Sequence, residues 1–290
     1  MALSNLAARV LFAVVAIPVV VGAVYAGGLF LALLLAVAAA LAAGELFRMV
    51  RATGGAPFAA AGVTIAFLLP IAVAGYQLGH FNPPVLTLGA VVVLALLAAA
   101  IWLRGPNGQP LGAVATTVFG VLYTAGMLSF AYAIRYHNYI LGAPAGTTLL
   151  VLPLAVTWGS DTAAYFVGRA IGRHKLIPAV SPGKTVEGAI GGLAAAMLVS
   201  WAYARFLLPR YAMLGMTPRN ALLFGLVVGV AVQVGDLAES LIKREANVKD
   251  SSHLIPGHGG VLDRIDSLLF ALPAAYFVFT FPHVLIPAIR

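Results

Sequence analysis

Long apolar stretches are the feature that most constrains how this chain folds. Nine of them follow one another along 290 residues: 8–26, 28–47, 57–76, 84–103, 112–134, 147–170, 187–208, 220–243 and 265–287. A helix of about 20 apolar residues crosses the hydrocarbon core of a bilayer. Charged residues make up 9% of the chain, whereas a soluble domain has about 25%. We therefore predict an all-α, polytopic integral membrane protein with about nine transmembrane helices.

Composition and charge exclude several classes of function. The chain has no cysteine, which rules out disulfides, thiolate zinc sites and a cysteine nucleophile. The net charge is +8, but no soluble basic domain is present to bind nucleic acid. With the N-terminus inside, twelve of the seventeen Lys and Arg residues fall on the inner side. We predict no nucleic-acid partner, an uncleaved first span, and location in the cytoplasmic membrane with the polar site facing the cytoplasm.

Acidic residues are confined to a short part of the chain. Every aspartate lies between Asp161 and Asp266, and Glu45 is the only acid outside that window. Because an ionised carboxylate inside a bilayer costs about 3 kcal/mol or more, such a local concentration predicts a bound cation. We predict that residues 1–145 are mostly scaffold and that residues 146–290 form the catalytic region.

The eighth apolar stretch carries one polar face. Asp236, Glu239, Ser240 and Lys243 are spaced at i, i+3, i+4 and i+7, which places them on the same side of a helix. A buried carboxylate paired with Lys or Arg is the structural alternative. Because a second carboxylate cluster follows closely in the sequence, we favour a functional role for this helix face.

That second cluster begins the last apolar stretch. Asp263 and Asp266 are at i and i+3 in the first turn of the predicted helix, where the helix dipole stabilises negative charge. Helix capping alone explains one of these residues, but not both together with His258. Gly259 and Gly260 allow a tight backbone path and a close approach to a ligand.

Hard oxygen ligands with few histidines suit Mg²⁺. Asp236 and Asp263 come from different predicted helices and are candidates to hold one or two such ions. A metal pair can clamp the phosphate oxygens of a nucleotide during an in-line attack.

A third polar segment runs from Asp161 to Gly188. Ser181-Pro-Gly-Lys-Thr185 is superficially similar to a P-loop, but it lacks the first glycine and a preceding soluble strand, so that fold is rejected. We predict an anion site here, formed by Lys184, the hydroxyls of Ser181 and Thr185, and the free amides at the start of the next helix. For Lys175, anchoring at the inner surface and a phosphate contact both remain open.

The run from Ser240 to Asp266 resembles the signature of the phosphatidate cytidylyltransferase family, also called CDP-diacylglycerol synthases. Asp161–Arg169 and Ser181–Gly188 also resemble that family, whereas the first half has no comparable motif. The matching signature residues are Ser240, Lys243, Arg244, Lys249, Asp250, Pro256, His258, Gly259, Gly260, Asp263, Arg264 and Asp266.

The resemblance implies a reaction of CTP with phosphatidic acid that gives CDP-diacylglycerol and pyrophosphate. It also implies Mg²⁺, with K⁺ as a candidate second ion and Asp236 and Asp263 as the main ligands. The lipid phosphate is the nucleophile, so the protein has to align two anions and reduce their repulsion. A homodimer is one assembly that the resemblance allows.

The predicted roles of the site residues follow from this chemistry. Asp161 and Asp266 support the metal or orient basic groups, and His258 orients a water or a phosphate. The basic residues predicted on phosphates are Lys184, Lys243, Arg244 and Arg264. The predicted substrate-binding residues are Arg169, Lys175, Ser181, Thr185, Ser240, Lys249, Gly259, Gly260 and Arg264.

Two other classes of function remain as alternatives. A CTP-dependent lipid kinase or a related CDP-lipid synthase would use similar spans and metal ligands. An ion-coupled transporter would also carry an intramembrane aspartate such as Asp236, but no corresponding pair of interrupted spans occurs in the two halves. The motif of CDP-alcohol phosphotransferases is absent.

Overall fold

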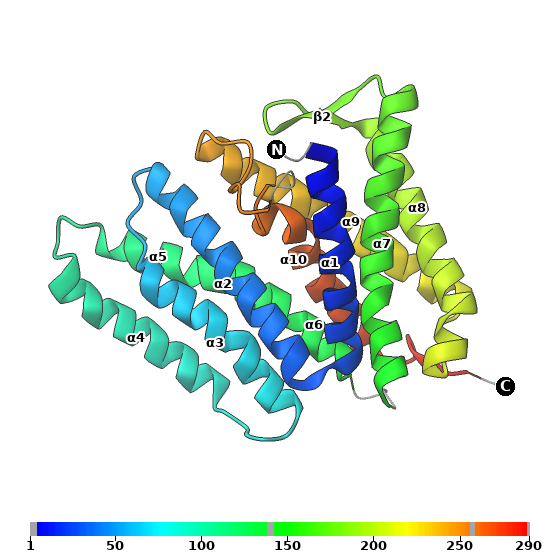
Figure 1. The fold of residues 1–290 in the computed structure, drawn as a ribbon, viewed down its shortest axis with the longest axis horizontal. Helices are drawn as coiled ribbons and strands as arrows, with labels where there is room; N and C mark the ends of the chain where they lie inside the picture. The colour runs from blue at the N-terminus through cyan, green and yellow to red at the C-terminus, as the bar shows by residue number, and fades with distance from the viewer. Residues whose placement is uncertain (1–4, 138–141, 256–258, 289–290) are drawn as a thin grey trace. The chain divides into compact units, whose positions relative to one another are not determined.

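The computed structural model describes residues 5–137, 142–255 and 259–288, and most of them are helical (Figure 1). The chain folds into two compact units. Unit 1 comprises Met1–Tyr132 and Ile242–Arg264, and unit 2 comprises Ala133–Leu241 and Ile265–Arg290. The prediction of a helical membrane protein is confirmed. The functional division into residues 1–145 and 146–290 stays a prediction.

Seven described helical stretches are long and apolar enough to cross a membrane: Gly28–Ala52, Ala59–Gln77, Val85–Leu103, Pro110–Arg135, Gly142–Ile171, Val186–Phe206 and Pro218–Glu245. Helix α1 (Asn5–Ala26) adds a shorter apolar segment, Val14–Ala26, and α10 (Leu262–Phe279) carries three charged residues at its start. A helix therefore forms in each predicted stretch, but the count of nine spans is not confirmed. Helices dominate because in lipid each backbone N–H and C=O group needs a partner within the protein.

Unit 1 is arranged around α2. Its other elements are α1, α3 (Ala59–Gln77), α4 (Val85–Leu103), α5 (Pro110–Val121), the π-helical turn η1 (Leu122–Gly126) and most of α6 (Met127–Arg135). Helix α2 (Gly28–Ala52) buries a continuous apolar face that includes Phe47. The Phe47 ring lies where a side chain at Gly62 of α3 or Gly120 of α5 would stand. These two glycines let three helices approach closely.

Unit 2 is built on α7, α8 and the larger part of α9. Its elements are α7 (Gly142–Ile171), β1 (Lys175–Ile177), β2 (Ser181–Thr185), α8 (Val186–Phe206), the π-helical turn η2 (Leu208–Ala212), β3 (Leu214–Gly215), α9 (Pro218–Glu245), α10 and β4 (Ile286–Pro287). Strands β1 and β2 form an antiparallel hairpin, and β3 pairs antiparallel with β4, which lies far along the chain after α9 and α10. Figure 1 shows α7 and α8 side by side, with the β1–β2 hairpin connecting them at one end.

Small residues bring the helices of unit 2 together. A Cβ atom on Gly188 of α8 would lie 2.7 Å from the Ala164 carbonyl oxygen of α7. A Cβ atom on Gly225 of α9 would lie 2.6 Å from the Ala196 carbonyl oxygen and from the Met197 Cα atom of α8. Close backbone contact of this kind drives helix association in membranes, where lipid tails are as apolar as the side chains.

We expect Gly225→Ala to destabilise the protein by about 1–3 kcal/mol, because the new methyl group meets backbone atoms that cannot move independently. Gly89→Ala on α4 is the matched control, since nothing lies within 4 Å of the added carbon. The control should be neutral or slightly stabilising, because alanine has the higher helix propensity. Thermal unfolding in detergent, followed by tryptophan fluorescence, measures both. Equal transition temperatures for the two variants would contradict the close α8–α9 packing.

Candidate active site

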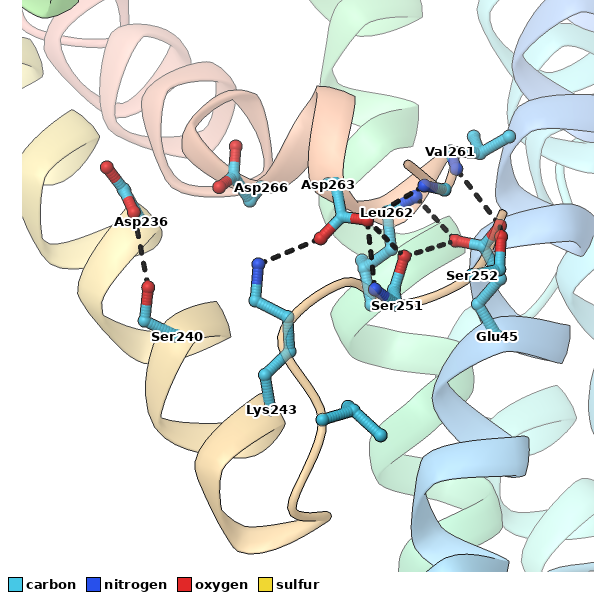
Figure 2. A network of polar contacts seen from close by, with 12 residues as sticks. Glu45, Asp236, Ser240, Lys243, Ser251, Ser252, Val261, Leu262, Asp263 and Asp266 are labelled. Atoms are coloured by element: carbon cyan, nitrogen blue, oxygen red, sulfur yellow. Dashed lines mark hydrogen bonds and ion pairs between the residues drawn. The ribbon is translucent and has the colours of Figure 1, made fainter. Parts of the chain in front are cut away.

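Asp263, in the first turn of α10, is surrounded by donors from unit 1 (Figure 2). The Lys243 Nζ atom lies 2.8 Å from Oδ1. Oδ2 accepts the Gly260 N–H at 2.8 Å and the Ser251 N–H at 2.9 Å, and the Ser251 hydroxyl oxygen is also 2.9 Å away. The Lys243 and Asp263 side chains are only 12% and 5% exposed. The carboxylate therefore holds the end of α9, the connecting segment and the start of α10 together.

A backbone bridge joins Ile255 and Gly259 of the connecting segment just before α10. The Ile255 N–H donates to the Gly259 carbonyl oxygen at 2.9 Å. Gly259 has a φ of +83°, a conformation that favours glycine over other residues. The next residue, Gly260, donates its N–H to Asp263.

Glu45 of α2 is part of the same cluster, although it was not among the predicted site residues. Its carboxylate is 1% exposed and accepts hydrogen bonds from the hydroxyls of Ser251 and Ser252 and from the amides of Val261 and Leu262. Figure 2 shows these contacts from α2 to the connecting segment. The signal was present in the sequence, because Glu45 is the only acid outside the 161–266 window.

Asp236 of α9 forms a separate cluster in unit 2. Its Oδ2 atom lies 2.6 Å from the Lys184 Nζ atom of β2, and the Ser240 hydroxyl lies 3.4 Å from Oδ1. Asp161 of α7 interacts electrostatically with both Asp236 and Lys184. Glu239, on the same helix, is fully buried. Three elements of unit 2 thus bring together two carboxylates and an ammonium group that sequence reasoning had assigned to one site.

The β1–β2 hairpin and the start of α8 are held by local hydrogen bonds. The Thr185 hydroxyl accepts the Gly188 N–H at 3.1 Å, so Thr185 is the N-cap of α8. Glu187 accepts the amides of Arg173 and His174 at the end of α7. The predicted anion-binding segment therefore has a defined shape, while its contact with substrate stays a prediction.

The other predicted residues are placed as follows. Arg169 donates to the Tyr165 hydroxyl at 2.9 Å, and Arg244 donates to the Val248 carbonyl oxygen at 3.2 Å. The Asp266 carboxylate accepts the Ser267 N–H at 2.7 Å. His258 lies outside the described residues. Ser181 is half-buried. The predicted site residues that are exposed are Asp161, Arg169, Lys175, Arg244, Lys249 and Arg264.

The two predicted metal ligands, Asp236 and Asp263, belong to different units, and each is paired with a lysine of its own unit. Among residues 5–137, 142–255 and 259–288, no three or more His, Asp or Glu side chains form a metal-binding group. Mg²⁺ usually takes one or two carboxylates and completes its shell with water and substrate phosphates. The assignment of Asp236 and Asp263 as ligands of one or two such ions stays a prediction.

Comparison with known proteins extends along the whole chain. A family model described as the cytidylyltransferase family matches residues 7–281. The phosphatidate cytidylyltransferase of Synechocystis is 31% identical over 97% of this chain and 98% of its own. The phosphatidate cytidylyltransferase of Pseudomonas aeruginosa is 37% identical over 91% of this chain and 93% of its own length. The enzyme of that name from Haemophilus influenzae is 42% identical over 63% of this chain and 61% of its own length.

We expect Asp263→Asn to lower the free energy of unfolding by about 1–3 kcal/mol, the cost of leaving buried donors unsatisfied. The amide nitrogen would face either the Lys243 ammonium or the two backbone N–H groups. Glu245→Gln, an exposed acid at the end of α9, is the control for loss of one negative charge. Thermal unfolding in detergent measures the difference. An Asp263→Asn protein as stable as the control would contradict the bonding described here.

Proposed function

The chain belongs to the cytidylyltransferase family, and on this basis we propose that it transfers a cytidylyl group from CTP to phosphatidic acid. The products are CDP-diacylglycerol and pyrophosphate, which places the enzyme in phospholipid biosynthesis. The observation that carries the proposal is the cluster around Asp263. In this cluster, four residues of the run from Ser240 to Asp266 form one hydrogen-bonded group: Lys243, Ser251, Gly260 and Asp263.

The reaction needs no nucleophile from the protein. An oxygen of the lipid phosphate attacks the α-phosphorus of CTP, the bond to the bridging oxygen breaks, and pyrophosphate leaves with that electron pair. Because both reactants are anions, the protein contributes mainly by aligning them and by stabilising the charge that develops in the transition state. Buried and partly buried cations suit this task better than solvated ones, since a low local dielectric strengthens their interactions.

The proposed phosphate ligands are Lys184, Lys243, Arg244 and Arg264. The two lysines are supported by fixed carboxylates, because Lys184 pairs with Asp236 and Lys243 pairs with Asp263. An ammonium group held in this way is ordered before the substrate arrives, so less conformational entropy is lost on binding.

We propose Mg²⁺ as the cofactor, with Asp236 and Asp263 as carboxylate ligands and K⁺ as a candidate second ion. When bound, Mg²⁺ would neutralise phosphate oxygens and polarise the phosphorus that is attacked. Asp161 and Asp266 would orient the basic groups or support the ion. We also propose that the site faces the cytoplasm, where CTP and Mg²⁺ are available. A homodimer is the proposed assembly, and light scattering tests it.

The first test is transfer of label in mixed micelles. Purified protein with phosphatidic acid and α-labelled CTP should move label into the lipid phase, and EDTA should abolish the transfer because the phosphates lose their metal ion. Failure of α-label to enter lipid would overturn the proposal. Label entering from γ-labelled CTP instead would identify a lipid kinase, and substrate flux without nucleotide turnover would identify a transporter.

We expect Lys184→Met to raise the KM for CTP about 10–100-fold, since a hydrogen bond to a charged group contributes about 1.5–3 kcal/mol. The variant removes the ammonium group but keeps an unbranched side chain of similar length. Arg51→Gln, at the exposed end of α2, is the control for loss of one positive charge. Steady-state kinetics with both variants measures the effect. A KM for CTP that is unchanged in Lys184→Met, with the protein still folded, would remove Lys184 from the proposed phosphate ligands.

A further inference from the structure

The Glu45 carboxylate is buried in unit 1 and is bound through hydrogen bonds. Its Oε1 atom accepts the Ser252 hydroxyl at 2.6 Å and the Val261 N–H at 3.0 Å, and its Oε2 atom accepts the Leu262 N–H at 2.8 Å. A buried carboxylate is costly unless its oxygens are bonded. Here the donors include amides at the start of α10, where the helix dipole also favours negative charge. Glu45 therefore ties α2 to the start of the helix that carries Asp263.

Ser251 connects Glu45 directly to Asp263. Its hydroxyl oxygen lies 2.9 Å from Glu45 Oε2 and 2.9 Å from Asp263 Oδ2. A hydroxyl has a single proton and can donate fully to one acceptor at a time. The Oδ2 atom of Asp263 also accepts the amides of Ser251 and Gly260, so it remains bonded when the Ser251 hydroxyl donates to Glu45. The oxygen that faces the cationic Lys243 side chain is the other one, Oδ1.

Gly260 shows how tightly this group is packed. A Cβ atom at Gly260 would overlap the Ser251 hydroxyl oxygen and the Glu45 Oε2 atom. Gly260 itself is buried. The glycine of the signature run thus makes room for Glu45 and Ser251, in addition to any role in the approach of a ligand.

We propose that Glu45 is a positioning residue of the active site. Glu45 orders Ser251 and the first turn of α10. As a result, the Oδ2 atom of Asp263 stays hydrogen-bonded to backbone amides, and its Oδ1 atom is directed toward the Lys243 ammonium group. Ser251 transmits this constraint, because it is the side chain that contacts both carboxylates. The expected effect of Glu45 on kcat rests on the proposed function. Its expected effect on the conformational order of residues 251–263 does not.

The experiment compares Glu45→Gln, Ser251→Ala and Ser252→Ala in the purified full-length protein. Ser252 is the matched control, because its hydroxyl donates to Glu45, whereas the Ser251 hydroxyl contacts both Glu45 and Asp263. Two quantities are measured: hydrogen–deuterium exchange of the amides of residues 249–266, and kcat and KM for CTP.

We expect Glu45→Gln to speed exchange of either the Val261 or the Leu262 amide, because its NH₂ group opposes one of these amides and one serine hydroxyl. We expect kcat to fall about 10–100-fold in Glu45→Gln and Ser251→Ala, the usual effect of removing a residue that orients a ligand. KM for CTP should change less than kcat, and Ser252→Ala should stay near wild type in both.

Unchanged exchange in Glu45→Gln would overturn the proposal, and so would equal losses of kcat in Ser251→Ala and Ser252→Ala, which indicate a structural role only. If Glu45→Gln does not fold, the two serine variants decide, since each removes a single hydroxyl. If the wild-type protein transfers no label to lipid, the proposed function fails, while the exchange data still decide whether Glu45 orders the segment.

Discussion

A carboxylate in an apolar interior is stable only where cations or hydrogen-bond donors surround it, because its loss of hydration otherwise costs several kcal/mol. The local structure around the acids of this protein follows from that requirement. Asp263 is surrounded by an ammonium group, backbone amides and a hydroxyl, and Glu45 is surrounded by hydroxyls and amides. The segment between α9 and α10 takes its path from the need to deliver these donors.

The same contacts would pre-organise the site proposed for anionic substrates. A lysine held by a fixed carboxylate is oriented before a phosphate arrives, and the pattern is found in both units, with Lys243 on Asp263 and Lys184 on Asp236. A hydrogen-bonded carboxylate likewise has few orientations left to lose. The interactions that stabilise the acids in the folded chain are therefore also those that pre-organise the groups proposed to bind nucleotide and lipid phosphate.

Much of the helical fold could be predicted because hydropathy and helix length are local properties of a sequence. Each predicted apolar stretch forms a helix, and the Pro and Gly residues between them mark the connections. The π-helical turn at Leu122–Gly126 and the hairpin at Lys175–Thr185 were not predicted. The π-helical turn packs against α2 and α3, which lie far from it in the chain, whereas the hairpin pairs residues within one short segment. Neither has a periodicity that distinguishes it from its surroundings.

The sequence by itself determined that the chain is a helical membrane protein and that its acidic residues, apart from Glu45, are concentrated between Asp161 and Asp266, since composition and spacing are readable without coordinates. Only the tertiary structure decided which groups meet. Glu45 lies more than two hundred positions from Ser251 along the chain, yet the two share a hydrogen bond. No local pattern encodes that contact. It arises because α2 and the connecting segment pack together, and a buried carboxylate needs every donor within reach.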